Sequence, residues 1–125
     1  MPGLQIIMPN AASPTDRYNE LLALMDGDRE LLLELIDVFL EDAPLRIQAV
    51  RRALEAHDAE ALYKAAHALK GSAGNFGAPD VVSRAIRLEA VARENDLDAA
   101  DIEFGFLETD MKELVDGLIE AKRLP

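Results

Sequence analysis

The chain has 125 residues, which suits one domain with a single core, and half of them are hydrophobic with few aromatics and no tryptophan. It has no cysteine, which excludes disulfides and thiolate zinc sites, and a reducing, cytoplasmic location fits this composition. The formal net charge of −11 argues against nucleic acid or an anionic membrane surface as a partner, and no apolar run approaches the roughly 20 residues that span a membrane.

Residues 1–14 contain three prolines and no Lys or Arg, so they do not resemble a signal peptide. We interpret them as a flexible tail or the remnant of a linker, and residues 15–125 as one folded domain. Thr15 or Asp16 can cap a first short helix. Its expected inner residues are Tyr18, Leu21, Leu22 and Met25.

Three helices are predicted in the next segment. Asp28 is a suitable N-cap for a helix over about 29–41. Asp42-Ala43-Pro44 predicts a turn, because a residue before proline disfavours helix, and a third helix then runs from Pro44 to about residue 56. His57-Asp58 ends that helix, where a partly charged His57 interacts favourably with the last carbonyls. Asp58 can cap a fourth helix, which Gly74 and Gly77 end.

Two further helices complete the chain. Pro79 opens a fifth helix, which ends at Asn95-Asp96. Its expected inner residues include Val82, Ala85, Ile86 and Leu88. A sixth covers about 98–122, with Gly105 as a point where it could kink or start late. Its expected inner residues are Leu107, Met111, Leu114, Val115 and Leu118. Short connections between amphipathic helices favour antiparallel neighbours, and hence an all-α helical bundle.

The fourth helix carries an unusual histidine. Its core-type stripe, at helical spacing, consists of Leu62, Ala65, Ala66, Leu69, Ala73 and Phe76. His67 projects from the opposite side, with Lys64 and Lys70 three residues before and after it. Gly71 and Gly74 lie further along the same side, although each mid-helix glycine costs about 1 kcal/mol relative to alanine. A function that needs an accessible imidazole beside an anion accounts for this arrangement.

The chemistry that fits this pattern is phosphoryl transfer to the imidazole. A neutral imidazole nitrogen is a good nucleophile near neutral pH, and attack on an activated phosphoryl group leaves an anion that Lys64 and Lys70 could pair with. Gly71 would leave room for the phosphoryl group and for a partner's surface. The sequence has no Gly-rich nucleotide loop and no obvious magnesium site near His67, so the activating machinery must come from a partner.

The segment Ala66-His67-Ala68-Leu69-Lys70-Gly71-Ser72-Ala73, followed by Gly77-Ala78, resembles the histidine-containing phosphotransfer (HPt) domain of multistep phosphorelays. The resemblance also covers 35–40 before Pro44, and Leu88-Glu89. It spans about residues 18–118. It implies an antiparallel, up-and-down four-helix bundle with additional short helices.

The resemblance also implies a function and a set of partners. His67 would accept a phosphoryl group from a receiver-domain aspartyl phosphate and pass it to another receiver, without kinase activity of its own. Lys70 would be its electrostatic partner, and Gly71 would keep access open. The partners would be receiver domains of response regulators or hybrid sensor kinases, with Mg²⁺ on the receiver and no cofactor or metal on this chain, which we expect to be a monomer. The docking surface would centre on His67 and include Tyr63, Lys64, Lys70, Gly71 and Gly74.

Other functions remain open from the residues alone. A dimerisation and phosphoacceptor module of a histidine kinase is also helical, but there we expect an acidic residue directly after the histidine, where this chain has Ala68. A helical interaction domain without catalysis is a further alternative. A di-iron bundle uses Glu-x-x-His pairs, whereas Lys64 and Leu54 stand three residues before His67 and His57.

Overall fold

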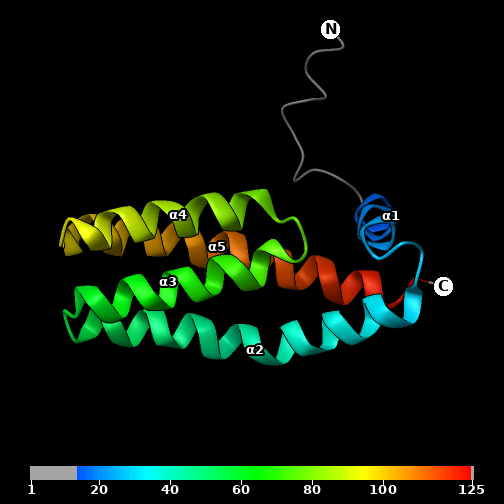
Figure 1. Ribbon diagram of the computed structural model, residues 1–125, viewed down its shortest axis with the longest axis horizontal. Helices are drawn as coiled ribbons and strands as arrows, with labels where there is room; N and C mark the ends of the chain where they lie inside the picture. The colour runs from blue at the N-terminus through cyan, green and yellow to red at the C-terminus, as the bar shows by residue number, and fades with distance from the viewer. Residues whose placement is uncertain (1–13, 125) are drawn as a thin grey trace, which may run out of the picture.

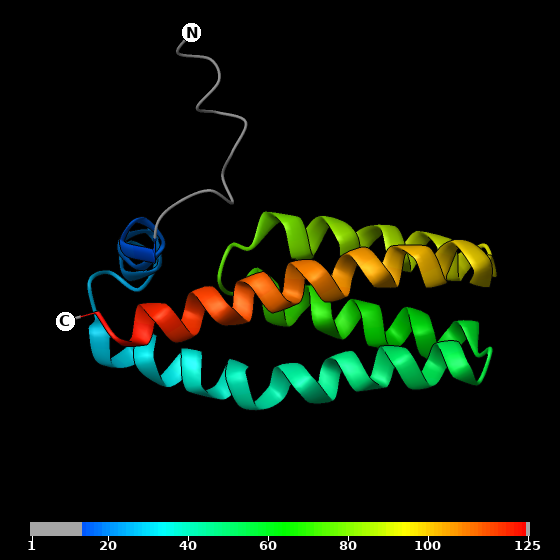
Figure 2. The same ribbon diagram turned by 180° about the vertical axis from the view of Figure 1, so that it is seen from behind.

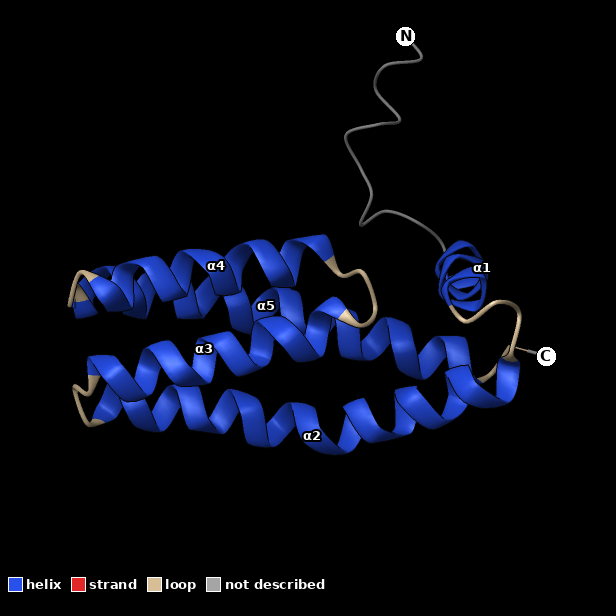
Figure 3. Cartoon of the chain, in the orientation of Figure 1, coloured by secondary structure: helices blue, strands red, loops and turns tan. Residues whose placement is uncertain are grey.

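The computed structural model describes residues 14–124, and every regular element in this range is a helix (Figure 3). The helices are α1 (Pro14–Leu24), α2 (Arg29–Glu55), α3 (Ala59–Gly74), α4 (Pro79–Arg93) and α5 (Leu97–Lys122). Helices α2 to α5 form an antiparallel up-and-down four-helix bundle, and the short α1 lies across one end of it (Figures 1 and 2). The predicted fold class is confirmed.

The first helix closes the end of the bundle where α2 starts and α5 ends. Tyr18 and Leu21 of α1 are buried, as predicted. Arg29, the first residue of α2, donates one hydrogen bond to the Tyr18 hydroxyl at 3.0 Å and another to the Leu124 carbonyl at 2.6 Å, so it ties the three helices together. The predicted tail lies outside the described residues, except for Pro14, the first residue of α1.

The predicted break at Pro44 is wrong, because α2 is one helix of 27 residues that contains this proline. The buried face runs through the position without interruption, with Phe39, Ala43 and Val50 all 3% exposed or less. A proline inside a helix costs about 3 kcal/mol, and packing along this face offsets that cost. The ring of Pro44 lies on the exposed side, and α2 is bowed (Figure 2). Residues 14–124 therefore contain five helices where six were expected.

The turns at one end of the bundle lie where the helices were predicted to end. His57 and Asn95 adopt left-handed backbone with φ of 54° and 58°, which stops α2 and α4. The next residue, Asp58 or Asp96, accepts a hydrogen bond from a backbone N–H in the first turn of the following helix, at 3.0 or 3.1 Å. Asp28 caps α2 in the same way, at 3.0 Å.

The inner face of α4 differs in part from the prediction. Its buried residues are Val81, Ala85, Leu88, Glu89 and Ala92. Ile86, expected inside, is 49% exposed, and Val82 is only half-buried. Val115 of α5 is also half-buried, while α5 continues through Gly105 without a break. None of the helices within residues 14–124 is long and apolar enough to cross a lipid bilayer.

Candidate functional site

The backbone of α3 presents His67 to solvent by burying the opposite face. Leu62, Ala66, Leu69 and Ala73 are fully buried, and Ala65 of the predicted stripe is half-buried. Phe76 is also buried, but it lies in the turn after α3 rather than on the helix. The His67 side chain is 61% exposed, at the seam between α3 and α4.

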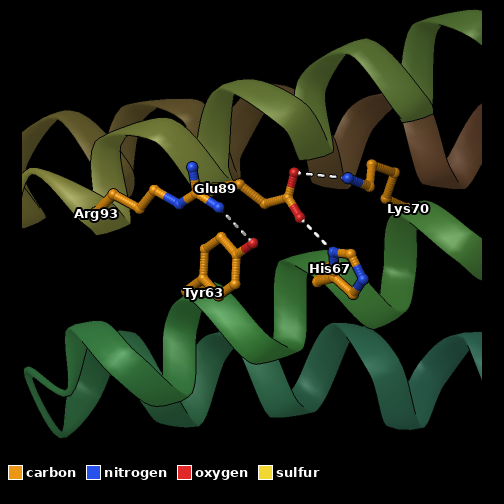
Figure 4. Close-up of polar contacts among 5 residues, drawn as sticks. All are labelled: Tyr63, His67, Lys70, Glu89 and Arg93. Carbon is orange, nitrogen blue, oxygen red and sulfur yellow. Dashed lines mark hydrogen bonds and ion pairs between the residues drawn. The ribbon is translucent and has the colours of Figure 1, made fainter.

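A carboxylate from α4 holds this imidazole in place (Figure 4). Oε2 of Glu89 lies 2.7 Å from Nδ1 of His67, and its other oxygen accepts a hydrogen bond from Nζ of Lys70 at 2.9 Å. The Glu89 side chain is only 10% exposed, so the carboxylate end of both interactions is largely shielded from water, whereas the imidazole is not. One buried carboxylate thus bridges the histidine and the lysine that follows it by one helical turn.

The charge of Glu89 determines which imidazole nitrogen carries the proton. Burial on its own raises the pKa of Glu89, but the hydrogen bonds from Lys70 and His67 and the attraction of these groups outweigh it, so the pKa lies below its ordinary value of 4.5. Near neutral pH the group is an ionised carboxylate, which can only accept hydrogen bonds. Nδ1 of His67 must therefore be the donor, and the lone pair of the neutral ring is on Nε2.

Tyr63 lies beside the imidazole on the side away from Lys70, and Arg93 in turn contacts Tyr63 (Figure 4). The Tyr63 ring stacks beside that of His67, with centroids 6.0 Å apart and an angle of 20° between the planes. Arg93 of α4 donates a hydrogen bond to the Tyr63 hydroxyl at 2.8 Å, and its guanidinium carbon lies 4.7 Å from the ring centroid. Tyr63 is thereby tied to α4 and limits the space into which His67 can rotate.

The remaining predicted site residues divide into two groups. Gly71 and Gly74 are exposed, and a Cβ atom added at either would meet no other atom within 4 Å, so the surface beyond His67 is open. Lys64 instead forms an ion pair of 3.2 Å with Glu60 on its own helix, and its side chain is 70% exposed. The structure therefore brings Lys70, but not Lys64, into the hydrogen-bonded group around His67.

Glu89 and Arg93 were not among the predicted site residues. A signal for Glu89 was present, because it stands between Ala85 and Ala92 on the buried stripe of α4. A charged side chain within an apolar stripe needs a partner, and a cation on the neighbouring helix was the obvious candidate. Arg93 gave no such signal, because its contact with Tyr63 depends on the register between α3 and α4.

Within residues 14–124, no three His, Asp or Glu side chains are grouped closely enough to hold a metal ion. The site offers an accessible imidazole nitrogen with a fixed orientation, beside a lysine and next to an open surface that carries Gly71 and Gly74.

Comparison with known proteins gives two matches. The family model described as the Hpt domain matches residues 34–120. A solved structure, that of histidine-containing phosphotransfer protein B from Pseudomonas aeruginosa PAO1, is similar with a TM-score of 0.77 and 28% sequence identity, covering 86% of this chain and 94% of that one. A search of curated proteins found no match.

Proposed function

The chain belongs to the Hpt domain family, which performs histidine phosphotransfer in phosphorelays, and from this premise we propose that Nε2 of His67 is the atom that carries the phosphoryl group. The observation that supports this most strongly is the hydrogen bond between Glu89 and Nδ1 of His67 at 2.7 Å. This hydrogen bond occupies Nδ1. It leaves Nε2 free to act as the nucleophile, on a side chain that is 61% exposed.

The transfer itself requires little from this chain beyond orientation and charge. Nε2 attacks the phosphorus of an aspartyl phosphate on a receiver domain, the N–P bond forms, and the P–O bond to the aspartate breaks. The ring gains positive charge, which the Glu89 carboxylate offsets through Nδ1–H. In the second transfer, an aspartate of another receiver attacks the phosphorus and Nε2 leaves with its lone pair.

Hpt carriers are generally not kinases and generally act with receiver domains. We infer that this chain likewise has no kinase activity of its own and acts as a monomer in the cytoplasm. Its partners would be receiver domains of response regulators or hybrid sensor kinases, with the Mg²⁺ ion bound by the receiver and no cofactor on this chain.

Phosphotransfer from a receiver is the direct test. The chain is incubated with a receiver domain that has been phosphorylated beforehand, and the phosphate on each protein is followed with time. We expect acid-labile, base-stable phosphate on this chain, which then moves to a second, unphosphorylated receiver. If no receiver delivers phosphate while the chain is folded, the proposed function is wrong.

The surface around His67 has apolar positions that sequence reasoning did not single out. Val38 and Leu45 of α2 are 63% and 64% exposed and lie seven residues apart, on one side of that helix. Val38 borders a small hollow together with Ser72 and Asn75 of α3. Val38 extends the proposed docking surface from the glycine positions of α3 onto α2. A receiver that covers the site would bury it.

Gly71 offers a test of access to His67. Gly71→Ala should raise the free energy of unfolding by up to about 1 kcal/mol, since the added Cβ meets open space and alanine favours the helix. Gly71→Gln should slow phosphotransfer, because its longer side chain enters the space that the phosphoryl group and the receiver need. The rate is measured under single-turnover conditions.

Gly105→Gln is the matched control, because Gly105 also lies within a helix and its added Cβ also meets open space. This variant should transfer phosphate at the normal rate. Equal rates for Gly71→Gln and Gly105→Gln would disprove the access argument.

Glu89→Gln should slow phosphotransfer and change the pH dependence of stability. Loss of a hydrogen bond between charged groups costs about 1.5–3 kcal/mol, or roughly 10- to 100-fold in rate. Because folding lowers the pKa of Glu89, its contribution to stability is present above the unfolded value of 4.5 and is lost as the pH falls through the folded value.

The measurement for Glu89→Gln is urea unfolding of both proteins at a series of pH values, from neutral to well below 4.5. The advantage of the wild type in unfolding free energy should be greatest near neutral pH and shrink on acidification. A difference that does not change with pH would contradict the assigned charge of Glu89.

The two lysines near His67 form a matched pair for testing electrostatics. Lys70→Ala should reduce the transfer rate by up to about tenfold at low salt and flatten its salt dependence, because Lys70 is the cation bound at the site. Lys64→Ala should have a smaller effect, since its side chain is 70% exposed and pairs with Glu60. A larger effect at Lys64 would reverse this assignment.

A further inference from the structure

Tyr63 lies one helical turn before His67 on α3, on the side toward which the His67 side chain leans. The Cα–Cβ bonds of a helix tilt toward its N-terminus, so side chains four residues apart lie one above the other. The two rings are close to parallel, with an angle of 20° between their planes and 6.0 Å between their centroids. In Figure 4 the second ring nitrogen of His67, Nε2, is on the side of the imidazole away from Tyr63. Tyr63 therefore lies behind the ring, where it does not obstruct Nε2.

The hydrogen bond to Glu89 holds only one edge of the imidazole. It joins Oε2 of Glu89 to Nδ1 of His67 at 2.7 Å, and 61% of the histidine side chain is exposed to water, which competes for the same nitrogen. A helix side chain has two common χ1 wells, and χ2 of histidine is roughly two-fold. An unrestrained ring therefore has about four orientations, of which one places Nδ1 on Glu89 and Nε2 outward. A contact on the face of the ring excludes some of the others.

Arg93 of α4 holds the Tyr63 ring through two contacts. It donates a hydrogen bond to the Tyr63 hydroxyl at 2.8 Å, and its guanidinium carbon lies 4.7 Å from the ring centroid. Arg93 follows Glu89 by four residues, as His67 follows Tyr63, so the two pairs form successive links across the α3–α4 seam (Figure 4). The ring behind the imidazole is thus fixed from the same helix that supplies the carboxylate.

We propose that Arg93 and Tyr63 are positioning residues for phosphotransfer. Arg93 holds the Tyr63 ring against His67, and this ring keeps the imidazole turned toward Glu89 with Nε2 outward. The inference rests on the function proposed above, because it takes Nε2 as the atom that carries the phosphoryl group. Arg93 acts on His67 only through Tyr63, and neither residue acts by binding the receiver. Uptake and delivery of the phosphoryl group need the same ring orientation, so both depend on this pair.

The orientation of the His67 ring can be measured by NMR without any partner. Three-bond couplings between Hα and the two Hβ protons report the χ1 populations in the isotope-labelled chain. The wild type should show one dominant rotamer, whereas Arg93→Gln and Tyr63→Ala should show couplings averaged over several. His57, in the α2–α3 turn, is the internal reference and should give the same couplings in every variant. Couplings of His67 that are unaltered in both variants would overturn the proposal.

Single-turnover transfer separates positioning from docking. The rate is followed at a series of receiver concentrations, at about 0.15 M ionic strength so that exposed charges are screened. Because the rate is proportional to the fraction of rings in the competent orientation, Tyr63→Ala should lower the maximal rate by up to about fourfold and Arg93→Gln by about twofold. The receiver concentration that gives half the maximal rate should stay the same. A normal maximal rate with a raised half-saturating concentration would show that the pair binds the receiver, against the proposal.

A double substitution and a matched arginine test whether Arg93 acts through Tyr63. In the Tyr63→Ala background, Arg93→Gln should cause no further loss of rate, because the ring that Arg93 holds is absent. Arg87→Gln is the control for the loss of charge, since Arg87 is also an exposed arginine of α4 and lies about 120° away around the helix. This control should transfer phosphate at the normal rate. A further loss in the double variant, or an equal loss with Arg87→Gln, would show that Arg93 acts by its charge and would refute the positioning role.

The wild-type rate and urea denaturation keep the different failures apart. Arg93 is exposed, so Arg93→Gln should stay folded and tests the proposal even if Tyr63→Ala, which removes a half-buried ring, does not fold. A folded wild type that accepts no phosphate from any receiver contradicts the proposed function, and the role of Arg93 and Tyr63 falls with it. A wild type that accepts phosphate at a rate that both substitutions leave unchanged contradicts the positioning role alone.

Discussion

His67→Gln is expected to abolish phosphate uptake from a phosphorylated receiver while the fold is retained. A glutamine amide nitrogen has no available lone pair for attack on phosphorus, so the loss should be complete rather than partial. The His67 side chain is 61% exposed, and the free energy of unfolding should change by less than about 1 kcal/mol. Phosphate on the chain is measured after transfer, and folding by urea denaturation.

His57→Gln is the matched control, because it removes the other histidine of the chain, which lies in the α2–α3 turn. This variant should take up phosphate at the normal rate. Phosphate uptake by the His67→Gln protein, or loss of uptake in the His57→Gln protein, would show that the wrong histidine was assigned.

Phe76→Ala should produce a large loss of stability, about 3–5 kcal/mol in the free energy of unfolding. Phe76 lies directly after α3, is only 4% exposed, and contacts Phe39 of α2 edge to face with ring centroids 5.1 Å apart. Removing the ring leaves a cavity and deletes a favourable aromatic pair. Urea denaturation followed by circular dichroism at the helical signal measures the change.

Phe106→Ala is the matched control, since it removes the same side chain from a position that is 49% exposed. It loses a contact with the guanidinium of Arg84, at 4.5 Å from the ring, and should cost no more than about 1 kcal/mol. If the two substitutions destabilise the protein equally, Phe76 is not the core residue that the structure indicates.

Much of the fold was predictable because several helix boundaries carry a local chemical signal. Asp28, Asp58 and Asp96 cap helices through their own side chains, and these effects act within three residues. The prediction of a helix break at Pro44 is wrong for the opposite reason. Proline disfavours a helix locally, but Phe39, Ala43 and Val50 pack against other helices, and this packing keeps α2 continuous through Pro44.

Only the part of the site that lies on α3 could be predicted from the sequence. The exposed side of α3, with His67, Lys70 and Gly71, follows from helical periodicity alone. Glu89 lies on another helix, and its two hydrogen bonds to α3 depend on how α4 is rotated and shifted against it. That rotation also exposes Ile86, which was expected inside. Sequence periodicity places residues on one helix, but it does not set the register between two helices.

The short turns at His57-Asp58 and Asn95-Asp96 favour rapid folding of this chain. In each, one left-handed residue stops a helix and the following aspartate starts the next, so the paired helices are neighbours in sequence as well as in space. Little loop-closure entropy is lost when such a pair forms. Helical proteins with contacts this local fold in microseconds to milliseconds, so a newly made chain would expose its apolar faces only briefly.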